Sequence, residues 1–192
     1  MQTRQRMAAI GLALAWSAPA LAQSIPPPCP PAPTRVVRSR GGVNDYLGSV
    51  PGIPDLCRMR RSDGSGEFYL GIWRSDWPGA GQAYPIMRAV IRGARGQRAS
   101  FVTRAWPGLQ WTDSFVNEGV ESVVVGGVTR PALRVVHERE GIEGNTYHSI
   151  ITFWLDLATG ANLRTDEHQI SGQSYGPDAT WHAVRIEPLP PG

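Results

Sequence analysis

The chain has 192 residues and a formal net charge of +3 at pH 7, and it includes 22 glycines, 17 prolines and two cysteines. This length is enough for one domain with a substantial core. Every basic residue is arginine; without the two arginines of the expected signal peptide, 17 arginines face 16 acids, and this near-neutral charge argues against a nucleic-acid partner.

The N-terminus has the pattern of a secretory signal peptide. Arg4 and Arg6 precede an apolar stretch over residues 7–16, and Ala20-Leu21-Ala22 forms an A-x-A cleavage site before Gln23. The apolar stretch is too short for a bilayer, which needs about 20 apolar residues. We therefore expect removal of residues 1–22 and a periplasmic or secreted protein that is not transmembrane. An uncleaved anchor is the alternative.

Cys29 and Cys57 are expected to form a disulfide. In an exported chain, an isolated pair is typical of one structural bond. The bond would close a loop of about 29 residues and stabilise the fold by roughly 3–4 kcal/mol. A metal or redox pair, the alternative, would be expected at the closer spacing C-x-x-C.

The segment that follows the signal is dominated by proline. Residues 23–34 contain six prolines and predict an extended polyproline II arm that acts as a spacer or lies along the body.

Residues 38–57 predict a loop with one short helical turn near residues 44–47. The arginines at 58, 60 and 61 are expected on a solvated face, with an anion site as the alternative.

Residues 35–192 are expected to form one mainly β domain. The predicted architecture is a curved antiparallel sheet, a half-barrel or open barrel of meander topology, with one short helix packed on it. Turn residues about every ten positions separate the strands. The predicted strands are Glu67–Arg74, Gln97–Ala105, Leu109–Asn117, Glu121–Val125, Ala132–Glu140, Thr146–Leu157, Ala161–Ser171 and Thr180–Glu187.

The helix is expected over Ala83–Arg92. Its apolar residues share one face, Pro85 would lie in the first turn where proline is tolerated, and Gly93 can end the helix. A strand is the alternative for this segment.

Residues 146–172 predict a long hairpin, beside which the other strands are expected to lie. Gly160 would take the positive φ of a loop over residues 157–160. Alternation from that loop places His148 and His168 on opposite faces, and a one-residue slip would exchange the faces. The expected pairs are Asp156 with Ala161, Trp154 with Leu163, and Phe153 with Arg164.

No catalytic, metal or cofactor site is predicted. Residues 172–176 match G-x-S-x-G, but a nucleophile elbow needs a buried strand before it and a helix after it, and here Pro177 follows. Asp166 and His168 share a strand face about 7 Å apart, and two ligands do not make a metal site. We expect a non-enzyme, with an enzyme as the alternative.

Two stretches carry a resemblance to a known family. A valine-rich strand at residues 123–125 turns at Gly126-Gly127 and re-enters as A-L-x-V at residues 132–135. The second stretch, W-x-D-x-x-T-G-x-x-x-R, runs from Trp154 to Arg164. Over about residues 122–187 the chain resembles periplasmic half-barrels of the lipoprotein-carrier (LolA/LolB-like) type. The resemblance implies a curved antiparallel sheet with a concave side available to an apolar ligand.

We expect an exported, non-catalytic binding protein that holds a lipid-like or other apolar ligand on the concave face of the sheet. Trp77 and Trp106 are candidates because they lie beside Pro-Gly turns, where a core role is less natural. The alternative is an envelope interaction protein that contacts another envelope protein through sheet edges and the proline arm. The expected lining residues are Trp111, Phe153, Trp154, Ile151, Met87, Trp77 and Trp106.

Overall fold

The computed structural model describes residues 25–31, 33–62, 64–106, 109–173 and 179–189, with Trp106 described by its backbone alone. The expected signal peptide lies outside these residues. The elements are β1 (Thr34–Arg38), β2 (Val43–Val50), β3 (Ile53–Arg61), β4 (Gly64–Tyr69), β5 (Trp73–Arg74), α1 (Ala80–Arg92), β6 (Arg98–Trp106), β7 (Leu109–Val125), β8 (Val128–Ile142), β9 (His148–Asp156), β10 (Asn162–Ser171) and β11 (Trp181–Pro188).

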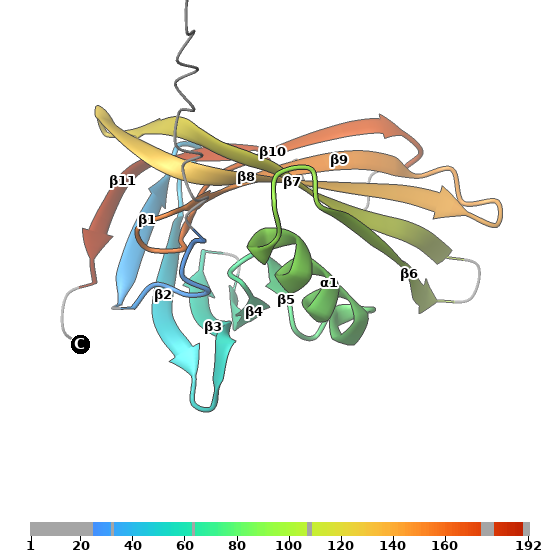
Figure 1. Ribbon diagram of the computed structural model, residues 1–192, viewed down its shortest axis with the longest axis horizontal. Helices are drawn as coiled ribbons and strands as arrows, with labels where there is room; N and C mark the ends of the chain where they lie inside the picture. The colour runs from blue at the N-terminus through green and yellow to red at the C-terminus, as the bar shows by residue number, and fades with distance from the viewer. Residues whose placement is uncertain (1–24, 32, 63, 107–108, 174–178, 190–192) are drawn as a thin grey trace, which may run out of the picture.

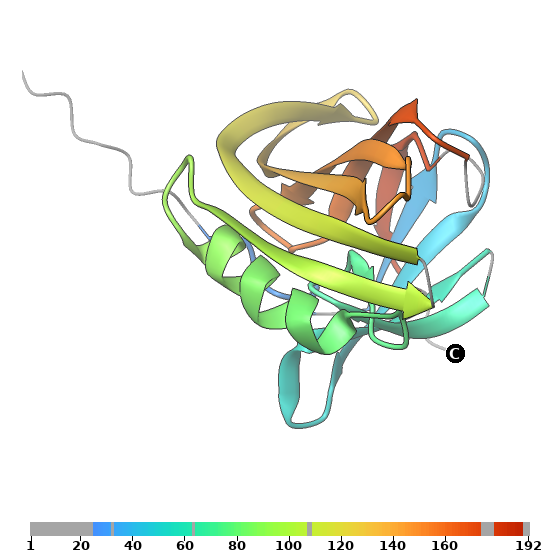
Figure 2. The same ribbon diagram turned by 90° about the vertical axis from the view of Figure 1, so that its right-hand side faces the viewer.

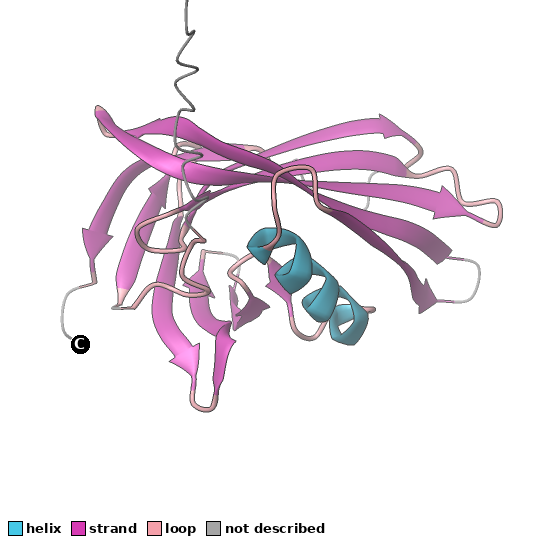
Figure 3. Ribbon diagram, viewed as in Figure 1, coloured by secondary structure: helices cyan, strands magenta, loops and turns pink. Residues whose placement is uncertain are grey.

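All eleven strands form one antiparallel sheet in the order β5-β4-β3-β2-β1-β11-β10-β9-β8-β7-β6. The order is a meander on each side of the β1–β11 pair. The sheet curls without closing, and α1 lies on its concave side (Figures 1 and 3). The predicted fold class, a curved antiparallel sheet with one short helix, is confirmed.

Helix α1 begins at Ala80, three residues earlier than expected. Pro85 is therefore inside the helix, and its placement in the first turn was wrong. Gly79 precedes the helix with φ 77° after the Trp77-Pro78 turn. Met87 and Val90 are fully buried on the face toward the sheet. Among the described residues, no helix is long and apolar enough to cross a membrane.

The expected loop over residues 38–57 is instead mostly strand, and residues 44–47 lie in β2 rather than in a helical turn. The reason is that β2 is held by tertiary contacts with other strands. The carboxylate of Asp45, 1% exposed, accepts hydrogen bonds from Arg35 on β1 and Arg60 on β3. The hydroxyl of the fully buried Tyr46 accepts a bond from the Asn162 N–H at 3.0 Å, and burial raises the pKa of Tyr46 to about 12.

Two other strand boundaries differ from expectation. The predicted strand Glu67–Arg74 is split into β4 and β5 by a turn in which Leu70 has φ 52° and Gly71 has φ 70°. The two predicted strands 109–117 and 121–125 are one 17-residue strand, β7, with a register shift between Asn117 and Gly119. A bulge bends a strand without ending it, which explains why glycine there looked like a strand end.

The β9–β10 hairpin closes as predicted and then changes register. The Asp156 N–H donates to the Ala161 carbonyl at 2.9 Å. A bulge between Asn162 and Arg164 then shifts the ladder, so the expected pairs beyond the turn were wrong. Trp154 pairs with Arg164, and Phe153 pairs with Thr165. The bulged residue, Leu163, is fully buried in the core.

This shift also changes the faces of the hairpin. His168 pairs with Ile150, which shares its face with His148 by alternation. The expectation that His148 and His168 lie on opposite faces was therefore wrong. The bulge is the physical cause, because one extra residue exchanges the two faces of every position beyond it.

The proline arm lies along the body. Cys29 and Cys57 form the expected disulfide, with Cα atoms 5.6 Å apart, and Cys29 is part of the core. Pro27 crosses the β9–β10 turn so closely that a Cβ on Gly160 would lie 1.9 Å from the Pro27 carbonyl oxygen. The arm is thus held by a covalent bond and by a close contact.

Replacing both cysteines (Cys29→Ser with Cys57→Ser) is expected to lower the free energy of unfolding by about 3–4 kcal/mol, because the bond closes a loop of about 29 residues in the unfolded chain. Urea denaturation of both proteins under oxidising conditions measures the difference. Reduced wild-type protein serves as the matched control. A loss below about 1 kcal/mol would show that packing alone holds the arm.

Gly160→Ala should destabilise the protein more than Gly52→Ala. Both residues have φ near 80°, at 76° and 80°, so the backbone strain of alanine is about 1–2 kcal/mol in each. Only Gly160 also has a close neighbour, since nothing lies within 4 Å of a Cβ at Gly52. Equal midpoints of thermal unfolding for the two variants would contradict the close contact with the arm.

Candidate functional site

Helix α1 occupies the part of the concave face where a ligand was expected. It lies beside β6 and β7 in two views of the fold (Figures 1 and 2). Met87, an expected lining residue, has no exposed surface and belongs to a core cluster with Phe115, Leu133 and Leu155. Core side chains therefore fill this region.

The other expected lining residues do not gather around one hollow. Trp111, Phe153 and Trp154 are buried, Ile151 is half-buried, and Trp77 is 51% exposed. By alternation on β9, Trp154 points to the face opposite Phe153. The side chain of Trp106 lies outside the described residues.

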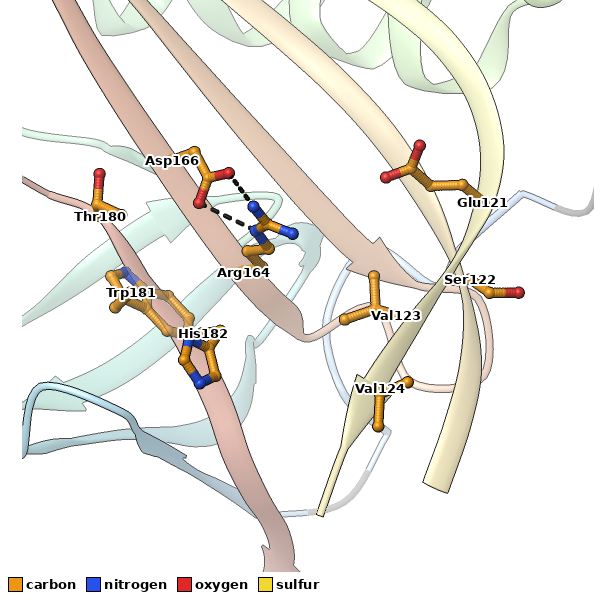
Figure 4. Close-up of a pocket in the computed structure, with 9 residues that line it drawn as sticks. All are labelled: Glu121, Ser122, Val123, Val124, Arg164, Asp166, Thr180, Trp181 and His182. Carbon is orange, nitrogen blue, oxygen red and sulfur yellow. Dashed lines mark hydrogen bonds and ion pairs between the residues drawn. The ribbon is translucent and has the colours of Figure 1, made fainter. Parts of the chain in front are cut away.

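A polar groove of about 460 Å³ lies between the tip of the β7–β8 hairpin and strands β10 and β11. The tip reaches β11 because β7 bends at its bulge, and a Cβ on Gly126 would lie 3.1 Å from the Val184 carbonyl oxygen. Figure 4 shows Val123 of β7 pointing across the groove toward the residues of β10 and β11, whereas Ser122 points away. The lining residues are Glu121, Ser122, Val123, Val124, Arg164, Asp166, Thr180, Trp181 and His182.

Arg164 is held in place at the base of the groove. It donates to both carboxylate oxygens of Asp166, through Nε at 3.0 Å and through Nη2. These bonds raise the pKa of Arg164. The guanidinium also lies 4.5 Å from the ring of Trp154, whose indole N–H donates to Glu121. Of the expected lining residues, Trp154 thus contacts two residues that line this groove, Arg164 and Glu121.

The described residues around the groove form no catalytic constellation that we recognise. Asp166 is paired with Arg164, and His168 is exposed on the same strand. Among the described residues, no group of three or more His, Cys, Asp or Glu side chains could hold a metal ion. The serine of the G-x-S-x-G string, Ser174, lies outside the described residues. Nor do the arginines at 58, 60 and 61 form a common site, since Arg60 is bound to Asp45.

A buried polar cluster on the concave face was missed by sequence reasoning. The carboxylate of Asp113 is fully buried and accepts a bond from Thr103 at 2.5 Å. Its other oxygen lies 2.7 Å from His137 Nε2 and accepts a bond from Arg139 Nε at 2.7 Å. The sequence did contain a signal for this cluster, because Asp113 interrupts the apolar strand face that Trp111 and Phe115 form by alternation.

Burial and hydrogen bonds have opposing effects on the pKa values of Asp113 and His137 in this cluster. Burial raises the pKa of Asp113, but hydrogen bonds and positive charge from His137 and Arg139 outweigh it and lower the pKa to about 2. Burial lowers the pKa of His137 and outweighs the opposing effect of Asp113. Near pH 7 the cluster therefore contains a carboxylate, a guanidinium and a neutral imidazole.

This cluster predicts acid sensitivity in two steps. Below pH 6.5 the unfolded chain protonates His137 more readily than the folded protein does, so stability falls as pH falls. Between pH 3.8 and about 2 protonation of Asp113 removes roughly 2 kcal/mol more. Urea midpoints measured between pH 7.5 and 5 test the first step, and His137→Gln should flatten it. An unchanged slope in His137→Gln would contradict the assignment.

Comparison with known proteins gives no relative for this site: no family model, curated protein or solved structure matches the chain.

Proposed function

We propose that this chain is an exported, non-catalytic binding protein that docks a partner protein of the cell envelope at the groove between the β7–β8 tip and strands β10 and β11. The observation that supports it is a group of exposed valines at and near the polar groove: Val124 (62% exposed) lines it, Val128 (59%) and Val120 (45%) lie on the same β7–β8 hairpin, and the backbone of Val184 (41%) lies beside the hairpin tip. Isolated apolar residues are normal on a surface, but a group at one place is typical of an interaction site.

The composition of this surface fits a protein partner. Polar and charged groove residues adjoin the valines, and protein interfaces typically combine an apolar centre with a polar surround. A free lipid tail offers no hydrogen-bonding group to polar lining residues such as Ser122 and His182. A polypeptide surface supplies both apolar contacts and hydrogen-bonding groups.

The surface is also held rigidly. Val123 and Val125 alternate with Val124 along β7, and they are buried in the same core cluster as Ala183 of β11. Packing on one side of the strand therefore fixes the exposed side. A preorganised surface loses less conformational entropy when a partner binds.

Export is supported by the disulfide between Cys29 and Cys57, because such bonds persist in oxidising compartments and are rare in the cytosol. The lipid-like ligand and the lipoprotein-carrier resemblance stay predictions. Burial of Met87 in the packed concave face favours the partner-protein hypothesis over the lipid hypothesis.

Site-specific photocrosslinking in the native host tests this proposal. A photoreactive residue at Val124 should give a discrete adduct with one envelope protein. The same residue at Ile53, which is 43% exposed on the β2–β3 hairpin, is the matched control and should give none. Val128→Glu should abolish the Val124 adduct, because a charge desolvated at the interface opposes binding.

Native mass spectrometry of the purified protein provides the opposing outcome. A retained lipid, together with equal crosslinking from Val124 and Ile53, would overturn the partner-protein proposal and favour the apolar-ligand function.

A further inference from the structure

We propose that Arg139 is the recognition residue of a carboxylate-binding site on the concave wall of the sheet, separate from the groove. The guanidinium donates one hydrogen bond, from Nε to Asp113 at 2.7 Å. Within the described part of the chain, its two terminal nitrogens have no hydrogen-bond partner. The side chain is 14% exposed, and neither terminal nitrogen is among the buried unpartnered atoms, so both reach the surface.

Five other arginines bind an aspartate through both Nε and Nη2: Arg35 and Arg60 to Asp45, Arg74 to Asp76, Arg130 to Asp156, and Arg164 to Asp166. Arg88 and Arg92 share Asp55, each through one nitrogen. Arg139 differs because Thr103 and His137 already occupy the two oxygens of Asp113. Arg139 therefore balances the charge of Asp113 while its planar pair of terminal donors stays available.

Two indole rings hold this guanidinium in place. Its Cζ lies 5.3 Å from the ring centre of Trp73 and 5.1 Å from that of Trp111. Contact with two rings restricts the rotation of the side chain before any ligand arrives. A guanidinium fixed in this way presents two parallel N–H donors, the geometry that matches a carboxylate.

Two further buried donors near Arg139 lack partners within the described residues. Ser149, fully buried, lies directly opposite Arg139 in the β8–β9 ladder, and its Oγ has no hydrogen-bond partner. Trp73, stacked on Arg139 and 94% buried, has an unpartnered indole N–H. A buried donor without a partner destabilises the folded protein. A carboxylate, which only accepts hydrogen bonds, would satisfy this donor set.

The surroundings also indicate the rest of the ligand. Trp77, 51% exposed, packs edge-on against Trp73 with ring centres 6.5 Å apart. This exposed indole offers a packing surface for a flat apolar group joined to the carboxylate. Besides Asp113, Glu167 acts electrostatically on this cluster, and its carboxylate accepts a bond from the Ala179 N–H at 2.8 Å. The class of ligand is an aromatic or otherwise apolar carboxylate.

Titration calorimetry with sodium benzoate as the probe, and benzamide as its neutral isostere, tests the proposal. Benzoate should bind saturably to the wild-type protein, and benzamide at least about tenfold more weakly, because it carries no charge for the guanidinium. Arg139→Lys keeps the charge beside Asp113 but removes the planar donors, so benzoate affinity should fall about tenfold or more.

Two more variants separate recognition from folding. Trp77→Ala alters an exposed side chain and should weaken benzoate binding several-fold without changing the midpoint of thermal unfolding. Arg164→Gln, at the groove, is the matched control and should bind benzoate as the wild type does. Absence of saturable benzoate binding, equal binding of benzamide, or wild-type affinity in Arg139→Lys would each overturn the proposal and leave ordered water as the partner of these donors.

Discussion

Pairing of buried aspartates with arginines is the interaction on which this fold depends. A carboxylate buried without a partner would cost several kcal/mol, so each one fixes the elements that supply its partners. Four buried aspartates form such joints between elements of the fold. Asp45 joins β1, β2 and β3 through Arg35 and Arg60, Asp55 holds α1 through Arg88 and Arg92, Asp113 joins β7 to β8 through Arg139, and Asp156 joins β9 to β8 through Arg130.

These joints explain why the curved sheet is filled rather than hollow. Asp55 on β3 holds the helix on the concave side, where Tyr84 also donates to it at 2.7 Å. Met87 and Val90 then complete a core with Phe115 and other sheet residues. The bend of β7 instead leaves an open space. It carries the tip of the β7–β8 hairpin across to β11, and the polar groove lies beneath this tip.

The two proposed binding surfaces use the same chemistry in contrasting ways. At the groove, Arg164 is paired with Asp166, so its donors are already used and the polar wall suits a broad protein contact. At the concave wall, Arg139 is positioned by Asp113 but keeps its terminal donors, which suits one small anion. Arginine serves both purposes because its guanidinium is always charged, planar and able to stack on tryptophan.

The sequence by itself predicted most strand segments from β6 to β11, with β7 divided in two, a helix over most of α1 and the Cys29–Cys57 bond, because alternation, turn residues and an isolated cysteine pair are local or compositional signals. It did not determine β2 and β3, since their strands depend on Asp45 meeting arginines from neighbouring strands. Nor did it determine the bulge that pairs Trp154 with Arg164, which was missed because the burial of Leu163 decides it. The groove and the Asp113 cluster likewise required the tertiary structure. Each brings together side chains from separate strands, and only the completed packing decides which of them meet.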